Sequence, residues 1–244
     1  MHIHDTSTAS IAATLPTAAL RAEFLLSNLF QVGAANFHYW TTDRTIVGAI
    51  VPGASALELP NPPEVRSAFF LERREAGVIN LGGPGTITVD GVIQTLASLD
   101  GLYLGRGTKM VSFASGSVEQ PARFYFLSYP AHAVYPVRHV AFQDATPARL
   151  GAVATANDRT IYKYFHPGAF PTCQLVMGFT RLESVFLTIY SMFLFFLLIP
   201  GNIIRLPLGG SKMIVGVTHA ILFGLIWHFT SHFIWVSGLS SRVK

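Results

Sequence analysis

Hydrophobic positions follow a helical period only near the beginning of the chain. Within residues 17–29, Leu20, Phe24, Leu25 and Leu29 recur near helical spacing, with polar residues between them. Residues three and four apart lie on the same face of a helix, so an apolar stripe of this kind can pack against a core. The spacing therefore predicts a short amphipathic helix.

From residue 44 onward the apolar residues gather into short runs separated by turn formers. The run at 44–53, RTIVGAIVPG, is β-branched and ends in Pro-Gly. The stretch 76–115 is interrupted by Gly-Gly-Pro-Gly, by Asp90-Gly91 and by Asp100-Gly101. Glycine accepts the positive φ of a tight turn, so Asp-Gly between alternating runs predicts a hairpin.

The alternation inside these runs has the period of a strand. In TITVDG, Ile87 and Val89 would face one side of a sheet, and Thr86 and Thr88 the other. Many short strands joined by glycine turns are typical of an antiparallel barrel or jelly roll. Helices and strands do not alternate, which argues against a Rossmann-like sheet. GRGTK and GGPG lack the spacing of phosphate-binding loops. Further strand-like runs lie at 123–128 and 137–142.

Charge divides the chain at Glu183. Residues 1–183 hold all 13 acidic residues and 13 of the 17 Lys and Arg, so their net charge is zero. Residues 184–244 hold the other four basic residues and no acid, so the net charge of +4 lies entirely in this tail. Nucleic-acid binding needs basic residues gathered on a folded face. We therefore expect no nucleic-acid partner.

The tail contains two uncharged runs, 184–204 and 213–241. About 20 apolar residues cross a bilayer core, so one interpretation is a hydrophobic, helical tail that forms a two-helix membrane hairpin through residues 184–237. The other interpretation is mistranslated sequence. Phe, Leu, Ile, Met and Val supply 31 of the 61 tail residues. Their codons share a central U, so U-rich non-coding sequence or a shifted reading frame gives this composition. Both interpretations stay open.

Few side chains outside the charged positions suggest a catalytic or metal-binding role. Cys173 is the single cysteine, which excludes an intrachain disulfide and a thiolate-rich zinc site, and its apolar neighbours favour a buried structural thiol. His2 and His4 have metal-ligand spacing, but a frayed terminus is the favoured interpretation. The first ten residues lack the basic and apolar regions of a secretory signal. A cytoplasmic protein is the default expectation.

Longer stretches resemble one enzyme family. They are FFLERREAGVINLGGPGTITVDG, LDGLYLGRGTK with VSFAS, RTIYKYFHP…CQLVMGFT, and the opening LRAEFLLSNLF. Over residues 17–183 the chain is similar to the 5-keto-4-deoxyuronate isomerases. The resemblance implies two cupin-like β-barrels, a cytoplasmic homohexamer and zinc. It also implies an aldose–ketose isomerisation of an unsaturated uronate sugar, 5-dehydro-4-deoxy-D-glucuronate, in pectin breakdown.

The expected fold class is therefore all-β, built on cupin-like antiparallel barrels, with a non-family hydrophobic tail. The expected domains are an N-terminal arm with a short helix (1–30), an N-terminal barrel without metal (31–150), the start of a second barrel (151–183) and the tail (184–244).

The chain departs from the family where the zinc ligands belong. The resemblance places them in the second barrel, on a His-x-His-x4-Glu stretch soon after MGFT and on a later His. Neutral imidazoles and one carboxylate leave an open position at which zinc polarises a carbonyl. Here MGFTRLES is followed by VFLTIYSMFLFFLLIPGN, which has neither His nor acid. The later His219, His228 and His232 have no carboxylate to complete a set.

We therefore expect this chain not to bind the family's zinc and to have impaired isomerase activity. The alternative is a non-catalytic cupin-like module, for binding or assembly, that the tail tethers to a membrane. In that case the protein would be membrane-associated rather than free in the cytoplasm.

Three residues are candidates for substrate binding, and no catalytic residue is assigned. Arginine suits a uronate carboxylate, which singles out Arg74 in the cluster at 72–75, although a solvated or interface charge cluster is the favoured interpretation. Lys163 and His166 immediately precede the start of the second module and are the better candidates. Their alternative roles are a linker lysine and a turn histidine before Pro167.

Overall fold

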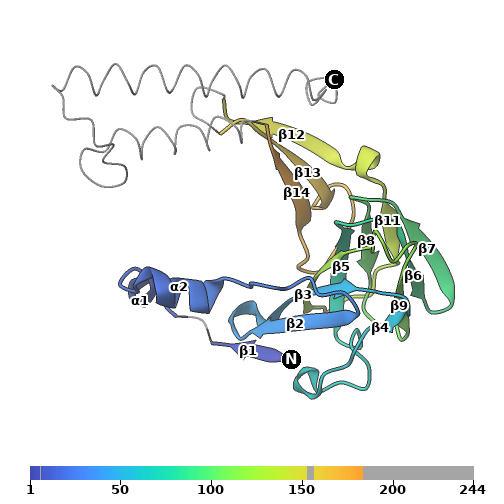
Figure 1. Ribbon diagram of the computed structural model, residues 1–244, viewed down its shortest axis with the longest axis horizontal. Helices are drawn as coiled ribbons and strands as arrows, with labels where there is room; N and C mark the ends of the chain where they lie inside the picture. Colours follow the sequence, from blue (N-terminus) through green and yellow to red (C-terminus); the bar gives the residue numbers. More distant parts are fainter. Residues whose placement is uncertain (6, 153–156, 184–244) are drawn as a thin grey trace, which may run out of the picture. The chain divides into compact units, whose positions relative to one another are not determined.

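The computed structural model of the protein describes residues 1–5, 7–152 and 157–183. Strands predominate, and they form three sheets (Figure 1). The seven-stranded sheet has the order β1-β2-β3-β10-β5-β8-β11, the four-stranded sheet β4-β9-β6-β7 and the three-stranded sheet β12-β13-β14. Every strand pair is antiparallel except β1–β2. The elements are β1 (His2–His4), α1 (Ala9–Ala12), α2 (Thr17–Phe24), β2 (Ala34–Trp40), η1 (Thr42–Arg44), β3 (Thr45–Val51), β4 (Leu57–Glu58), η2 (Pro63–Val65), β5 (Arg74–Asn80), β6 (Gly85–Val89), β7 (Val92–Leu96), β8 (Gly101–Leu104), β9 (Val111–Ser115), β10 (Phe124–Pro130), β11 (Arg138–Val140), η3 (Phe142–Asp144), β12 (Thr146–Leu150), β13 (Arg159–Phe165) and β14 (Met177–Leu182).

The first Asp-Gly pair makes the hairpin that its sequence predicts. Asp90 and Gly91 both have positive φ, 47° and 88°, between β6 and β7. Two successive positive φ values give the twist that joins antiparallel strands in a two-residue turn. The predicted alternation in β6 is also confirmed, because Ile87 and Val89 are buried whereas Thr86 is half-buried.

The second Asp-Gly pair does not make a hairpin, because the strands on either side of it belong to different sheets. β7 lies in the four-stranded sheet and β8 in the seven-stranded sheet. The Asp100 carboxylate accepts the Ala97 N–H at 2.9 Å and the Phe142 N–H at 2.9 Å. Asp100 thus stabilises a crossing between sheets, which a local turn signal cannot distinguish from a hairpin.

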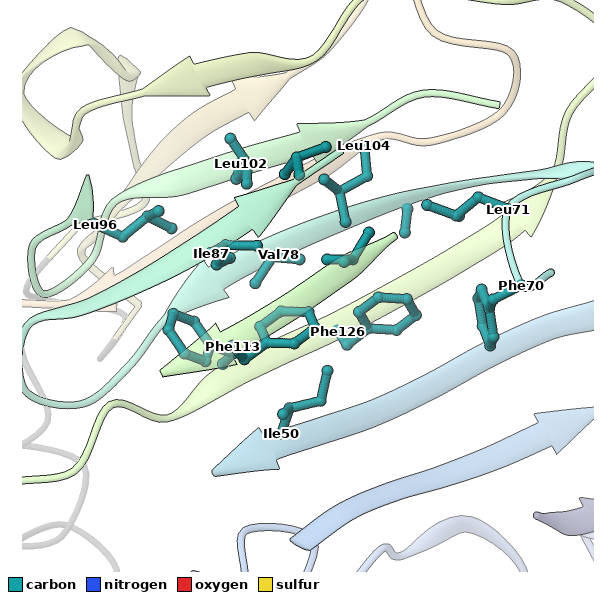
Figure 2. Packing of buried hydrophobic residues seen from close by; sticks show 14 of the residues in the cluster. Ile50, Phe70, Leu71, Val78, Ile87, Leu96, Leu102, Leu104, Phe113 and Phe126 are labelled. Atoms are coloured by element: carbon teal, nitrogen blue, oxygen red, sulfur yellow. The ribbon is translucent and has the colours of Figure 1, made fainter. Parts of the chain in front are cut away.

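The main core, here called the first core, lies between the seven- and four-stranded sheets. Its members are apolar and come mostly from strands of both sheets, and Figure 2 shows their side chains packed against one another. Phe126 is fully buried, and its ring centroid lies 5.1 Å from that of Phe37 and 5.5 Å from that of Phe70. Such edge-to-face pairs add to the stabilisation that burial provides.

The predicted all-β class is confirmed, and of the two predicted architectures, an antiparallel barrel or a jelly roll, the described strands do not close into a barrel. The two facing sheets share no strand pairing, so the fold is an open sandwich. Facing sheets bury their inner surfaces without closing hydrogen bonds around a ring. The pattern of alternating residues is the same in both architectures, which is why the sequence alone could not separate them.

A second core lies on the other face of the seven-stranded sheet. All seven residues of β5 are buried. Alternate strand residues point to opposite faces: Ala76 and Val78 belong to the first core, whereas Ile79 belongs to the second. The second core joins Ile79 and Tyr103 to residues of β13, β14 and the segment between them; its other buried members are Ala145, Tyr164, Phe165, Leu175 and Met177.

The predicted N-terminal helix is present as α2, which ends at Phe24 and so is shorter than the 17–29 pattern. A four-residue helix, α1, precedes it. Among the helices that the structure describes, none has the length and apolar character needed to cross a bilayer. The predicted helical tail and membrane hairpin of 184–237 lie outside the described residues.

Candidate functional site

The most unusual polar group in the described chain is the carboxylate of Glu75, which is fully buried on β5. It accepts four hydrogen bonds, from the Tyr103 hydroxyl at 2.7 Å and from the backbone N–H groups of Cys173, Gln174 and Leu175 at 2.9, 2.6 and 2.8 Å. An ionised carboxylate can only accept, so burial away from water requires donors of this kind. Glu75 thereby fixes the segment 173–175 against the seven-stranded sheet.

Tyr103 supports this arrangement from β8. Its ring is fully buried, with centroids 5.9 Å from Phe165 and 5.0 Å from Phe170. Burial, and then the hydrogen bond to Glu75, raise the pKa of the Tyr103 hydroxyl above its usual range. Tyr103 therefore remains a neutral donor to Glu75 throughout the physiological pH range.

Arg74, the neighbour of Glu75, points to the opposite face of the sheet. Its Nε donates to Ser128 Oγ at 3.1 Å, and its Nη2 donates to the carbonyls of Arg44 and Ser128 at 2.6 and 2.9 Å. Burial, reinforced by the charge of Arg44 and opposed by Tyr39, lowers the pKa of the Arg74 guanidinium to about 10. Arg74 is therefore still charged at neutral pH.

The expectation of a solvated or interface charge cluster at 72–75 is wrong for two of its members. Only 6% of the Arg74 surface is exposed and none of Glu75, and both are used in internal hydrogen bonds. A buried charge is stable only when it is paired or hydrogen-bonded, which is what each side chain achieves. The role of Arg74 as a substrate ligand stays a prediction.

The structure brings Lys163 and His166 to the same strand neighbour, Thr146 of β12. Lys163 lies on β13, where it pairs with Thr146 on one side and Gly178 of β14 on the other. His166 follows the end of β13, with its Nε2 3.5 Å from Thr146 Oγ1 and its Nδ1 2.9 Å from the Pro167 carbonyl oxygen. Lys163 is therefore a strand residue and not a linker residue, whereas His166 occupies the expected turn.

A cavity of about 360 Å³ adjoins this region and is lined by residues 167–172. Arg74 is not brought to it. Arg74 shares the face of Ala76 and Val78, which line the first core, whereas β13 and β14 pack on the face of Ile79. The three predicted substrate residues therefore occupy two separate places.

Cys173 is half-buried at the edge of the Glu75 site. Its Sγ accepts the Ala133 N–H at 3.3 Å and donates to the Ala133 carbonyl at 3.5 Å. These contacts fit the predicted structural thiol. Sequence reasoning did not assign this role to Glu75 and passed over Tyr103. The available signal was an acidic residue, Glu75, placed directly before the mostly apolar run AGVIN.

Three histidines meet at the opposite end of the seven-stranded sheet. β1 pairs with β2 in parallel, which places His2 opposite His38 and His4 opposite Trp40. The His4 Nε2 lies 2.8 Å from the His38 Nδ1. Burial, followed by the neighbouring histidines, lowers the pKa of both His4 and His38. The expectation of a frayed end is wrong, because residues 2–4 form a paired strand.

The KduI/IolB family profile matches residues 25–184. The 4-deoxy-L-threo-5-hexosulose-uronate ketol-isomerase of Caldicellulosiruptor bescii is 45% identical over 169 residues, covering 69% of this chain and 61% of the relative. The enzymes of the same name from Paraburkholderia phytofirmans and Yersinia enterocolitica are 41% and 45% identical, covering 75% and 70% of this chain and 66% and 62% of theirs.

The chain thus spans less than two thirds of the length of these curated relatives. Among solved structures, an IolB-like protein from Salmonella typhimurium shares 15% identity with a TM-score of 0.39, covering 49% of this chain and 43% of that one. That likeness is too slight to support any inference.

Proposed function

The chain belongs to the KduI/IolB family, and on this premise we propose that it is a 4-deoxy-L-threo-5-hexosulose-uronate ketol-isomerase by descent whose own turnover is impaired. The observation that carries the proposal is the identity of 41–45% to enzymes of that name, across 169–185 residues. The substrate class is an unsaturated uronate sugar, 5-dehydro-4-deoxy-D-glucuronate. The reaction class is an aldose–ketose isomerisation in pectin and uronate catabolism.

The residues present do not fit the zinc that the resemblance implies. No three imidazole, thiol or carboxylate side chains converge on one point, as they stand, in the part of the chain that the structure describes. Residues 184–244 contain no Glu or Asp. Impaired turnover is the functional consequence that we propose.

We propose that the uronate substrate binds at Lys163 and His166. A lysine ammonium is a point charge that can pair with the uronate carboxylate. His166 carries both donor and acceptor nitrogens for sugar hydroxyls, and its contact with Thr146 Oγ1 at 3.5 Å is long enough to be exchanged for a ligand. Arg74 lies on the other face of the sheet and is bonded to Ser128 and Arg44, so it is not included in this proposed site.

Turnover of the purified full chain tests the proposal directly. Conversion of 5-dehydro-4-deoxy-D-glucuronate is followed beside the Yersinia enterocolitica relative, with and without added zinc. We expect turnover far below that of the relative and no restoration by zinc. Family-like turnover with one zinc per chain would contradict the proposal.

Substrate binding is a separate readout. Lys163→Ala is expected to weaken binding of the uronate by about tenfold, the loss of one charge-assisted contact. Lys109→Ala, at an exposed position, is the matched control and should bind as the unaltered chain does. Equal affinities for the two variants would remove Lys163 from the site.

A second candidate function rests on the uncharged runs 184–204 and 213–241. In this alternative the chain is a non-catalytic module for binding or assembly that is tethered to a membrane. Under the isomerase proposal the protein lies in the cytoplasm. Extraction of the full chain from cell membranes distinguishes the two. Release only by detergent favours the tethered module, and recovery without detergent counts against it. Sedimentation then tests for a homo-oligomer, which is a hexamer by family resemblance.

A further inference from the structure

We propose that His4 and His38 form a pH-sensitive latch, which holds β1 against β2 at neutral pH and releases it when acid protonates both rings. The pair joins the N-terminal strand to the edge of the seven-stranded sheet, where β1 is the last strand in the order. Neither residue belongs to the Lys163–His166 region, so the latch does not depend on the proposed isomerase function.

The hydrogen bond between the two rings requires one unprotonated nitrogen. His4 Nε2 lies 2.8 Å from His38 Nδ1, so one of these nitrogens donates a proton and the other accepts it. A neutral pair and a singly protonated pair can both keep this bond. When both rings are protonated, every ring nitrogen is a donor. The second proton therefore removes the hydrogen bond and places two like charges against each other.

The surroundings of the pair oppose that second proton. Burial, followed by the charges of His4, His2 and the Met1 amino group, lowers the pKa of His38. Burial and then the charge of His2 lower the pKa of His4. The centroid of the His2 ring is 4.6 Å from that of His4 and 5.6 Å from that of His38. Both rings of the pair are only half-buried, so protons from the solvent can reach them.

The carboxylates on neighbouring segments do not offset the added charge. Glu23 accepts the Ser7 N–H and hydroxyl at 2.7 and 2.9 Å, and Glu64 lies 3.6 Å from the Met1 amino group. Other titratable groups on these segments are exposed or, for the tyrosine, lie on the opposite face of β2: Asp5, Arg21, Tyr39, Asp43, Arg44 and Arg66. Within the described part of the chain, no carboxylate bonds to either ring of the latch.

The attachment of β1 depends strongly on this pair because the strand is short. Its three residues pair in parallel with residues 38–40, and the His4 carbonyl accepts the Thr41 N–H at 3.1 Å. The His4 ring also stacks on Trp40, with centroids 4.3 Å apart and planes inclined by 9°. A short strand at a sheet edge has few backbone hydrogen bonds and opens locally at low cost. Its release would expose the edge of β2, whose N–H and C=O groups could then pair with another strand.

The direction of the pH effect follows from the lowered pKa values. In the released strand the two histidines return to the ordinary value of about 6.5, so the released state binds more protons than the docked state. Acid therefore favours release. Docking of β1 is stable above the ordinary value and is lost as the pH falls through the lowered values of the docked pair.

Hydrogen exchange of the full chain at about pH 7.5 and about pH 5 tests the latch, with each rate divided by the intrinsic rate at that pH. We expect the protection of the amides at 2–4 and at Thr41 to fall by about tenfold or more at the lower pH. Amides of β3 and β10 should keep their protection.

His38→Asn is the decisive variant. The Asn oxygen can take the place of His38 Nδ1 and accept the His4 N–H at either pH, but Asn does not titrate. Protection of residues 2–4 in this variant should therefore be similar at both pH values. His132→Asn, at an exposed position, is the matched control and should show the same fall as the unaltered chain.

Two results would overturn the latch: equal protection of residues 2–4 at both pH values in the unaltered chain, or an equal fall in His38→Asn. Loss of protection in β3 and β10 together with β1 would also overturn it, because acid would then unfold the whole sheet. If His38→Asn does not fold, His4→Gln places an amide at the position of Nε2 and carries the same expectation. The isomerase assay has no bearing on these outcomes.

Discussion

The two faces of the seven-stranded sheet are buried in different ways. The first core is apolar throughout and is sealed by a second sheet. The second core is smaller, and the Glu75 carboxylate lies at its edge, bonded to three backbone N–H groups. One strand, β5, supplies both faces from alternate residues. The first face depends on non-directional burial, whereas the second also depends on directional hydrogen bonds that fix one segment in one position.

The largest effect is expected from a cavity in the first core. Phe126→Ala removes a fully buried ring that contacts Phe37 and Phe70, and should lower the free energy of unfolding by about 4 kcal/mol. Urea unfolding measures the loss. Ile93→Ala, at a site 66% exposed, is the control and should change stability by less than about 0.5 kcal/mol. Comparable losses in both would mean that the first core is not the main source of stability.

Replacement of the buried carboxylate should break the second core selectively. Glu75→Gln turns one acceptor into a donor facing N–H or O–H groups, at an expected cost of about 3 kcal/mol. Hydrogen exchange of the amides at 173–175 should accelerate by roughly 100-fold, while amides of β6 and β9 keep their protection.

Glu58→Gln, at an exposed position, is the matched control for Glu75→Gln and should leave both cores unchanged. Uniform acceleration across the two cores would show that they unfold together and would end the distinction between them.

Close packing over β5 provides a smaller test. A Cβ at Gly77 would lie 2.6 Å from Met177 Sδ and 2.8 Å from Leu175 Cδ2. Gly77→Ala should therefore destabilise by about 2 kcal/mol, because the side chains of the second core must move. At Gly53 the nearest atom is 3.5 Å away, so Gly53→Ala should be close to neutral. Thermal unfolding of the two variants gives the comparison.

The smallest expected effect is a pH dependence within the three-stranded sheet. The Arg149 guanidinium donates to both Asp158 oxygens at 3.0 and 2.7 Å and lowers the pKa of that carboxyl. A lowered folded-state pKa means a stabilising contribution that is present above the ordinary value near 4 and is lost as the pH falls through the folded-state value. The Asp158 side chain is 6% exposed but Arg149 is 71% exposed, so solvent weakens the pair.

The measurement is the melting temperature as the pH falls from about 5 through the ordinary carboxyl pKa near 4 and below it, because the lowered folded-state pKa of Asp158 places the loss on the acid side of that value. Asp158→Asn should flatten the fall relative to the unaltered chain. Asp144→Asn, at an exposed position, should keep it. A parallel fall in both variants would assign the acid sensitivity to other carboxylates.

Local features of the fold were predictable where the cause is local. The turn at Asp90-Gly91 needs two positive φ values, and the burial of Ile87 and Val89 against Thr86 follows from a period of two. Asp100-Gly101 is the same residue pair, yet the chain passes there from one sheet into another, and the Asp100 carboxylate accepts a bond from the Phe142 N–H, 42 positions away. Sheet membership depends on strand pairing between distant residues, which a local turn signal does not contain.

The candidate sites show the same limit. Residue chemistry singled out Arg74, Lys163 and His166 as substrate ligands. In the folded chain, Arg74 points to one face of the seven-stranded sheet and contacts Ser128, whereas Lys163 and His166 both lie beside Thr146 of β12. Three of the four hydrogen-bond partners of Glu75 lie about 100 positions along the chain. His2 and His4 meet His38 only because β1 adds to β2 in parallel.

Sequence alone thus established the all-β character, the family and the loss of acidic residues after Glu183, because composition, periodicity and motif are properties of neighbouring residues. Sheet order, the open sandwich and the pairing of buried polar groups came from the folded chain. Strand pairing joins residues distant in sequence, and a buried charge takes whichever donors that pairing brings to it.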